Sequence, residues 1–178
     1  MQEVLGALGV IQGNPQQTRL ITPYADGLKV FSTFLDSAKS KWRTIIYGDT
    51  HPVFFDKAIA FFKAGHDILI IFDHTQSCGP AEKAQIQRLV DAGMVEGKHF
   101  IIGTSPEAHQ IIHLKSTWLD DRYVEDGSLN YSPSGLKQVN SVSIMDWPEY
   151  ANYLNGIFQE LWKWILEHEP QYQLKVGS

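Results

Sequence analysis

The sequence contains one cysteine, Cys78, and this excludes a disulfide bond within the chain. It also lacks an uninterrupted apolar run of about 20 residues, the length that a membrane-spanning helix requires. The first residues carry Glu3 and no Lys or Arg, so they do not resemble the positively charged start of a secretory signal peptide. We therefore predict a cytoplasmic protein with no transmembrane segment.

Positive charge is scarce as well. The chain has 15 Lys and Arg residues against 20 Asp and Glu residues, a formal net charge of -5. This balance supplies no overall attraction for nucleic acid or for an anionic bilayer, so local positive charge must hold any polyanionic ligand. Lys39, Lys41 and Arg43 form one basic cluster that could follow a phosphate backbone, although such clusters are more often a solvated helix end.

No linker, internal repeat or low-complexity tract divides the chain, and 43% of its 178 residues are hydrophobic. This is enough apolar side chain for one well-packed core. We expect a single domain that spans residues 1–178.

Short β-rich apolar runs alternate with segments of helical periodicity, and this alternation predicts an α/β fold. Residues 67–73 are apolar on both faces, as in a central strand covered by helices on each side. We therefore predict a mixed central sheet with helices on both faces. Strands are expected at residues 18–22, 42–47, 67–73, 99–102, 111–119, 123–124 and 140–145, and helices near 28–38, 50–65, 80–93 and 146–165, with Thr50 and Asp146 as N-caps.

The most informative segment carries polar residues at fixed spacing, H-x-K-x4-D-x6-G-S-x-N. The six positions are His113, Lys115, Asp120, Gly127, Ser128 and Asn130. Such a coincidence would arise by chance on the order of once in 10⁵ to 10⁶ sequences of this length. The spacing resembles the signature of the phospholipase D superfamily, and the weaker resemblance of the flanking segments covers about residues 18 to 165.

This resemblance implies a metal-independent phosphodiesterase that uses no cofactor. His113 would attack phosphorus and form a phosphohistidine, which water later hydrolyses. Lys115, Ser128 and Asn130 would hold the phosphate oxygens as negative charge develops. Asp120 is included among the catalytic residues in a supporting role that orients the site, and Gly127 and Asn140 support the loop.

The sequence departs from the superfamily pattern at Val139. Members commonly have a Glu directly before the residue that matches Asn140, where it accepts a hydrogen bond from the other nitrogen of the nucleophilic histidine. The neighbouring Gln138 could accept that bond, but it would not stabilise an imidazolium as a carboxylate does.

The superfamily active site uses two such motifs, because one histidine attacks while the second protonates the leaving oxygen. This chain has only one His-x-Lys of this kind, so the resemblance implies a homodimer in which two copies of His113 and Lys115 meet at one phosphate. Four of the five tryptophans are candidates for the interface, with core packing as the alternative for each. They are Trp118, Trp147, Trp162 and Trp164.

Two other histidines suggest alternative roles. His109 and His113 have the i, i+4 spacing of a helical zinc site, but the zinc protease pattern needs Glu where Gln110 stands, and a strand would separate the two rings too far for one ion. We therefore predict no metal site. His74 follows a strand end, where loops line ligand clefts in α/β sheets, so it is either an auxiliary site residue or a solvated histidine.

Substrate class follows from the resemblance alone. Superfamily members with a single motif are most often nucleases, and a minority act on phospholipids such as cardiolipin. We therefore expect nucleic acid as the substrate, with a phospholipid as the alternative. A third hypothesis is a dimeric phosphate-binding or nucleic-acid-binding module that turns over slowly because the Glu is missing.

Overall fold

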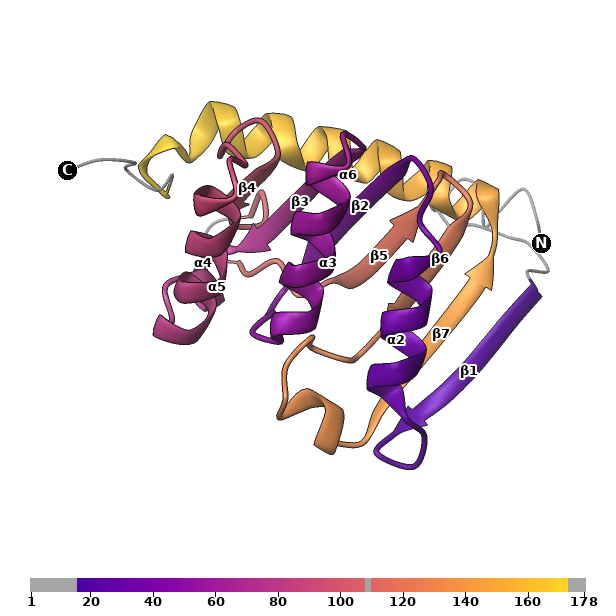
Figure 1. Cartoon of the computed structure of the whole chain (residues 1–178). Helices are drawn as coiled ribbons and strands as arrows, with labels where there is room; N and C mark the ends of the chain where they lie inside the picture. Colours follow the sequence, from indigo (N-terminus) through magenta and orange to yellow (C-terminus); the bar gives the residue numbers. More distant parts are fainter. Residues whose placement is uncertain (1–15, 108–109, 173–178) are drawn as a thin grey trace.

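The computed structural model describes residues 16–107 and 110–172. Its centre is a seven-stranded sheet with the strand order β1-β7-β6-β5-β2-β3-β4 (Figure 1). Strands β2, β3 and β4 are parallel and all other neighbours are antiparallel, so the predicted mixed sheet is confirmed. The strands are β1 (Gln16–Thr22), β2 (Lys41–Ile46), β3 (Asp67–Asp73), β4 (Phe100–Gly103), β5 (Lys115–Leu119), β6 (Tyr123–Gly127) and β7 (Asn140–Asp146).

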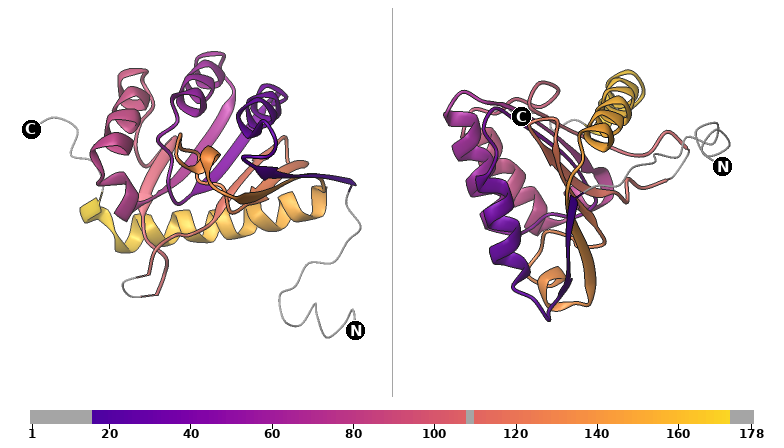
Figure 2. Two further views of the ribbon diagram at one scale, coloured as in Figure 1. Left: turned by 90° about the horizontal axis from the view of Figure 1, so that it is seen from below. Right: turned by 90° about the vertical axis from the view of Figure 1, so that its right-hand side faces the viewer.

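Helices cover both faces of the sheet, as predicted. The helices α2, α3 and α5 lie on one face and α6 lies across the other, which is clearest in the right-hand view of Figure 2. Parallel neighbours need crossover connections, and α3 and α5 supply them between β2, β3 and β4. The helices are α2 (Gly27–Asp36), α3 (Pro52–Lys63), α4 (His74–Ser77), α5 (Pro80–Asp91) and α6 (Pro148–His168), with short 3-10 helices at Gly135–Lys137 and Pro170–Tyr172.

Two apolar cores result from this layering. Along β3, Ile70 and Phe72 point into the core beneath α2, α3 and α5, whereas Ile71 points into the core beneath α6. This alternation explains why the strand is apolar at nearly every position. Among the described residues, no helix is both long and apolar enough to cross a membrane.

The structure corrects the predicted start of β5. The apolar pair Ile111-Ile112 suggests that the strand begins at residue 111, but β5 begins at Lys115. The amide of Ile112 donates instead to Oδ2 of Asp73 at 2.7 Å, so it is not available to a sheet ladder. His113 therefore lies in the connection that enters β5, and not within the strand.

Both predicted helix caps are also wrong. The cap of α3 is His51, one residue after Thr50, and its Nδ1 accepts a hydrogen bond from the amide of Val53. Asp146 belongs to β7, and both of its carboxylate oxygens are held at 2.7 Å by Arg122. Because that carboxylate is engaged, it does not cap α6.

Trp118 is removed from the interface candidates by its burial. The side chain is 1% exposed in the core beneath α6, and its indole N–H donates to Oδ1 of Asn155 at 2.9 Å. Trp147, Trp162 and Trp164 are partly buried against the same core.

Candidate active site

The candidate site forms where β2 and β3 end and β5 begins. The amide of Tyr47, directly after β2, donates to the carbonyl of Leu114 at 2.9 Å, so the segment before β5 continues alongside β2. The carboxyl ends of parallel strands are where ligands bind in open α/β sheets. His113 lies at these strand ends.

His113 and Lys115 meet at the ring of Tyr47. The His113 and Tyr47 ring centroids are 4.7 Å apart, and Nζ of Lys115 lies 4.8 Å from the centroid of the Tyr47 ring. The same Nζ donates to the carbonyl oxygen of His113 at 2.6 Å. The histidine is exposed and the lysine is 4% exposed, so an open imidazole lies beside a shielded amino group.

Burial sets the electrostatics of this lysine. Removal from water lowers the pKa of Lys115, and the negative charge of Asp73 partly opposes that shift. A cation in such a shielded place attracts an anion more strongly than one surrounded by water. Lys115 is therefore suited to holding a phosphate oxygen.

The Gly127-Ser128 turn is built by close contact with β7. A Cβ at Gly127 would lie 2.2 Å from the carbonyl oxygen of Ser141, so no other residue fits without displacing the backbone. The Ser128 hydroxyl donates to Oδ1 of Asn140 at 3.0 Å and accepts from the amide of Ser141 at 3.1 Å. Asn140 in turn donates to the carbonyl of Gly135 at 2.9 Å. Ser128 and Asn140 thus close the loop, and Ser128 itself is exposed.

Asn130 lies beside the segment that contacts the histidine. A Cβ at Gly48 would lie 3.6 Å from Oδ1 of Asn130, and Gly48 directly follows Tyr47. This oxygen is buried and has no hydrogen-bond partner among the described residues. The structure therefore brings Asn130 to the same edge of the sheet as His113 and Lys115.

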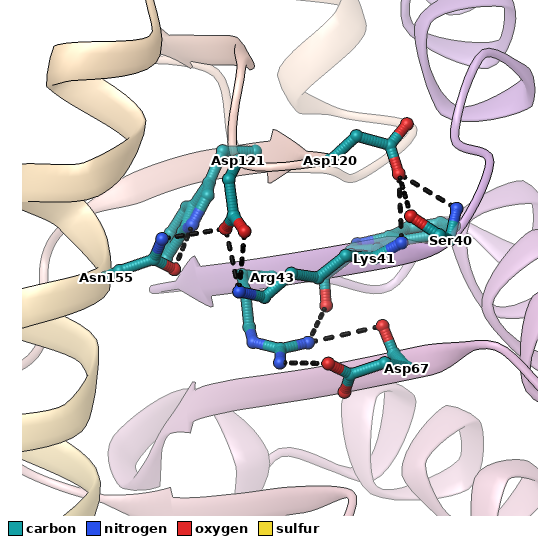
Figure 3. Close-up of polar contacts among 9 residues, drawn as sticks. Ser40, Lys41, Arg43, Asp67, Asp120, Asp121 and Asn155 are labelled. Carbon is teal, nitrogen blue, oxygen red and sulfur yellow. Dashed lines mark hydrogen bonds and ion pairs between the residues drawn. The ribbon is translucent and has the colours of Figure 1, made fainter.

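Asp120 is not part of this cluster. It follows the far end of β5, five residues from Lys115, which is about 16 Å of extended chain. Its carboxylate accepts hydrogen bonds at 2.8 to 3.0 Å from the amides of Ser40 and Lys41 and from the Ser40 hydroxyl (Figure 3). It also accepts one from the amide of Lys39 at 3.0 Å. Asp120 therefore anchors the chain that enters β2, so the orienting role predicted for it would act through the strands and not by contact with His113 or Lys115.

The predicted basic cluster lies at this same far end and is largely neutralised. Lys41 forms a salt bridge with Asp121 at 2.8 Å, and the largely buried Arg43 forms one with Asp67 at 2.5 Å (Figure 3). The third member, Lys39, donates a hydrogen bond from its backbone amide to the carboxylate of Asp120. The cluster therefore stabilises the far end of the sheet, and it does not form a basic path along which a phosphate backbone could reach His113.

The remaining candidates have other partners. Gln138 is exposed, and its carbonyl oxygen accepts from the hydroxyl of Thr22 at 2.7 Å. His74 begins α4, where its ring stacks on Tyr172 with centroids 3.7 Å apart and its Nε2 lies 3.2 Å from Sγ of Cys78. His109 lies outside the described residues. Within the described part of the chain, no group of three or more His, Cys, Asp or Glu side chains is arranged to hold a metal ion.

Two residues of the site were not predicted. Tyr47 contacts both His113 and Lys115, and Asp73 binds the amide of Ile112 next to the histidine. Tyr47 and Asp73 are the last residues of the strands predicted at 42–47 and 67–73. Because ligands bind beyond the carboxyl ends of parallel strands, this position could have identified both residues.

The mixed sheet, with His113 and Lys115 at its edge, defines a protein of the phospholipase D superfamily. The chain belongs to the family described as "Cardiolipin synthase, PLD-like domain", whose model matches residues 31–162. Membership of this superfamily supports phosphodiesterase activity. A comparison with curated protein sequences finds no match.

Solved structures share the fold. Nuc from Salmonella typhimurium, described as a phospholipase D family member, has a TM-score of 0.72 at 23% identity, over 84% of this chain and 95% of Nuc. NucT from Helicobacter pylori has a TM-score of 0.72 at 18% identity, over 84% of this chain and 97% of NucT. Phosphatidylserine synthase from Haemophilus influenzae Rd KW20 has a TM-score of 0.57 at 14% identity, over 89% of this chain and 40% of the synthase.

Proposed function

We propose that the chain is an endonuclease that hydrolyses phosphodiester bonds of nucleic acid through a phosphohistidine at His113. The observation that carries the proposal is the pairing of the exposed His113 with the shielded cation of Lys115 on one aromatic ring. A phosphodiester resists nucleophiles because it is anionic, so a site must supply a nucleophile and neutralise charge together. These two side chains meet both requirements.

The chemistry proceeds in two displacements. A nitrogen of His113 attacks phosphorus, a P–N bond forms and the P–O bond to the leaving group breaks. A second histidine donates a proton to the departing oxygen and then removes one from water, whose oxygen attacks phosphorus and releases His113. Lys115 and Asn130 hold the non-bridging oxygens through both steps. The phosphate contact predicted for Ser128 is not part of this mechanism, because its hydroxyl binds Asn140 and the Ser141 amide, and Ser128 instead maintains the loop that carries Asn130.

We propose that the second histidine is His113 of another copy of the chain. Exposed apolar side chains near the site support a symmetric contact: Tyr24 is 84% exposed, Val139 is 70% exposed and Ile21 is 40% exposed. Ile21 pairs with Ser141, and Val139 precedes Asn140, so these side chains adjoin the Ser128 loop. Apolar surface of this kind is characteristic of contact regions.

Nucleic acid is the proposed substrate because the chain carries a single motif, as the nucleases of this superfamily most often do. Phospholipid is the second candidate, since the family that matches residues 31–162 is described by cardiolipin synthase. Val139 leaves the imidazole without the superfamily's neighbouring carboxylate, so we expect turnover to be slower than a Glu at that position would allow.

The proposal predicts cleavage of nucleic acid in the presence of EDTA. The purified chain should be incubated with plasmid, single-stranded DNA, RNA and cardiolipin vesicles, each with and without the chelator. We expect at least one nucleic acid to be cut at an unchanged rate in EDTA, with phosphate left on one product end. Release of phosphatidic acid from cardiolipin alone would favour the phospholipase, and binding without any cleavage would favour the phosphate-binding module.

The shared site predicts that an inactive copy suppresses an active one. Wild-type chain mixed with a ninefold excess of His113→Ala should retain about a tenth of its activity after subunit exchange, because few wild-type chains then pair with each other. The matched control is an equal excess of His66→Ala, which keeps His113. Sedimentation should show a dimer. Undiminished activity, or an active species that is strictly monomeric, would rule out the shared site.

A further inference from the structure

Asp73 connects the start of α4 to the segment that carries His113. It is the last residue of β3 and is fully buried. Its Oδ1 accepts from the amides of Thr75 and Gln76 at 2.9 and 3.3 Å, which caps α4. Its Oδ2 accepts from the amide of Ile112 at 2.7 Å, one residue before His113.

The hydrogen bond to Ile112 is not needed for the helix cap. The cap uses Oδ1 alone, so Oδ2 is free to hold the segment that enters β5. That segment lacks sheet ladder bonds at Ile112, and the Tyr47 amide binds it only at Leu114. The position of the His113 backbone therefore depends on a side chain from another strand.

Burial raises the pKa of Asp73, and the hydrogen bonds that it accepts from the amides of Ile112, Gln76 and Thr75 oppose that shift. Its negative charge favours the protonated form of Lys115. Burial raises the pKa of Glu82 to about 8, and the charge of Asp73 adds to that shift. Burial likewise raises the pKa of Asp49, whose amide donates to Glu82. Burial therefore favours the neutral form of both neighbours. The other titratable groups near Asp73 are His74, which follows it in the chain, and His113 beyond Ile112.

We propose that Asp73 is a positioning residue of the phosphodiesterase site, which fixes the His113 backbone through the amide of Ile112. The inference rests on the proposed roles of His113 and Lys115. Asp73 touches neither substrate nor reacting atoms. Instead, its carboxylate joins the segment that carries His113 to the start of α4.

The test is Asp73→Asn, which preserves shape and can still cap α4, since Asn is as good a cap as Asp. Asparagine has one acceptor oxygen and no charge, so it cannot also bind the Ile112 amide as a carboxylate does. We expect kcat to fall by about 10- to 100-fold with little change in KM. The basic limb of the pH profile should move to lower pH, because loss of the anion favours neutral Lys115.

A second readout does not depend on activity. The titration of the Lys115 side chain, followed by NMR and assigned by its loss in Lys115→Arg, should move to lower pH in Asp73→Asn, and the Ile112 amide signal should shift. Asp26→Asn is the matched control, because Asp26 caps α2 through the amide of Lys29. It should change none of these quantities. Asp73→Ser, which keeps a capping oxygen, replaces Asp73→Asn if that variant does not fold.

Unchanged turnover, pH profile and Lys115 titration in Asp73→Asn would overturn the inference. A change in melting temperature alone would also overturn it, because a purely structural cap predicts nothing more. If the wild-type chain cleaves no substrate, the proposed function fails, but the Ile112 signal still decides whether Asp73 holds the segment that carries His113.

Discussion

Replacing His113 with alanine is expected to reduce phosphodiester hydrolysis by on the order of 10³-fold or more, because the nucleophile is lost and no phosphohistidine can form. The fold should be unaffected. His113 is exposed, and its side chain contacts the ring of Tyr47 without filling a core. The variant should therefore melt within a few degrees of the wild-type chain, which thermal denaturation will show.

The matched control for this change is His66→Ala. His66 is also exposed and also contacts one aromatic ring, that of Phe61 at 4.6 Å, but it precedes β3 at the opposite end of the sheet. We expect its activity to equal that of the wild-type chain. Turnover near the wild-type rate in His113→Ala would show that a different residue attacks phosphorus.

Removing the cation at Lys115 should have an effect of similar rank. Both Lys115→Met and Lys115→Ala are expected to lower kcat/KM by about 150-fold or more, which corresponds to about 3 kcal/mol of lost transition-state stabilisation. Methionine keeps the apolar stem of this buried side chain, so it separates loss of charge from loss of packing. Lys63→Met, at an exposed position, is the control. A loss below tenfold in both variants would contradict the assignment.

The lowered pKa of Lys115 gives this prediction a pH dependence. Lysine binds phosphate as a cation only while protonated, so activity should fall as the pH rises through a pKa that burial has moved below the usual lysine range. Lys115→Arg keeps its charge to above pH 12, so any residual activity in that variant should lack this basic limb. A limb that persists unchanged in Lys115→Arg must arise from another group.

The layered fold is predictable because local pattern and final burial agree. Ile70, Ile71 and Phe72 are apolar in succession, and each lies in a core on one or the other face of the sheet. Element ends are less predictable, since long-range partners decide them. The sequence does not reveal that the amide of Ile112 donates a hydrogen bond to Asp73, or that Arg122 donates to the carboxylate of Asp146.

The same limit applies to the site. Spacing places His113 and Lys115 on one side of the chain, and their meeting at Tyr47 follows from the pairing of β2 with β5. The motif treats Asp120 as one more member at a fixed offset. Five residues of extended chain already place Asp120 about 16 Å from Lys115. What the sequence does not reveal is its task there, which its contacts with Ser40 and Lys41 show.

The exposure of His113 has a steric consequence for the proposed nuclease. His113 is exposed in the single chain, so in the proposed dimer its two copies would face each other across a groove that a phosphate anywhere along a polymer could enter. Such a polymer can lie across the site without threading a terminus through it. Circular and linear molecules would then be equivalent to the enzyme, and the ends of a nucleic acid would give it neither an entry point nor a direction of travel.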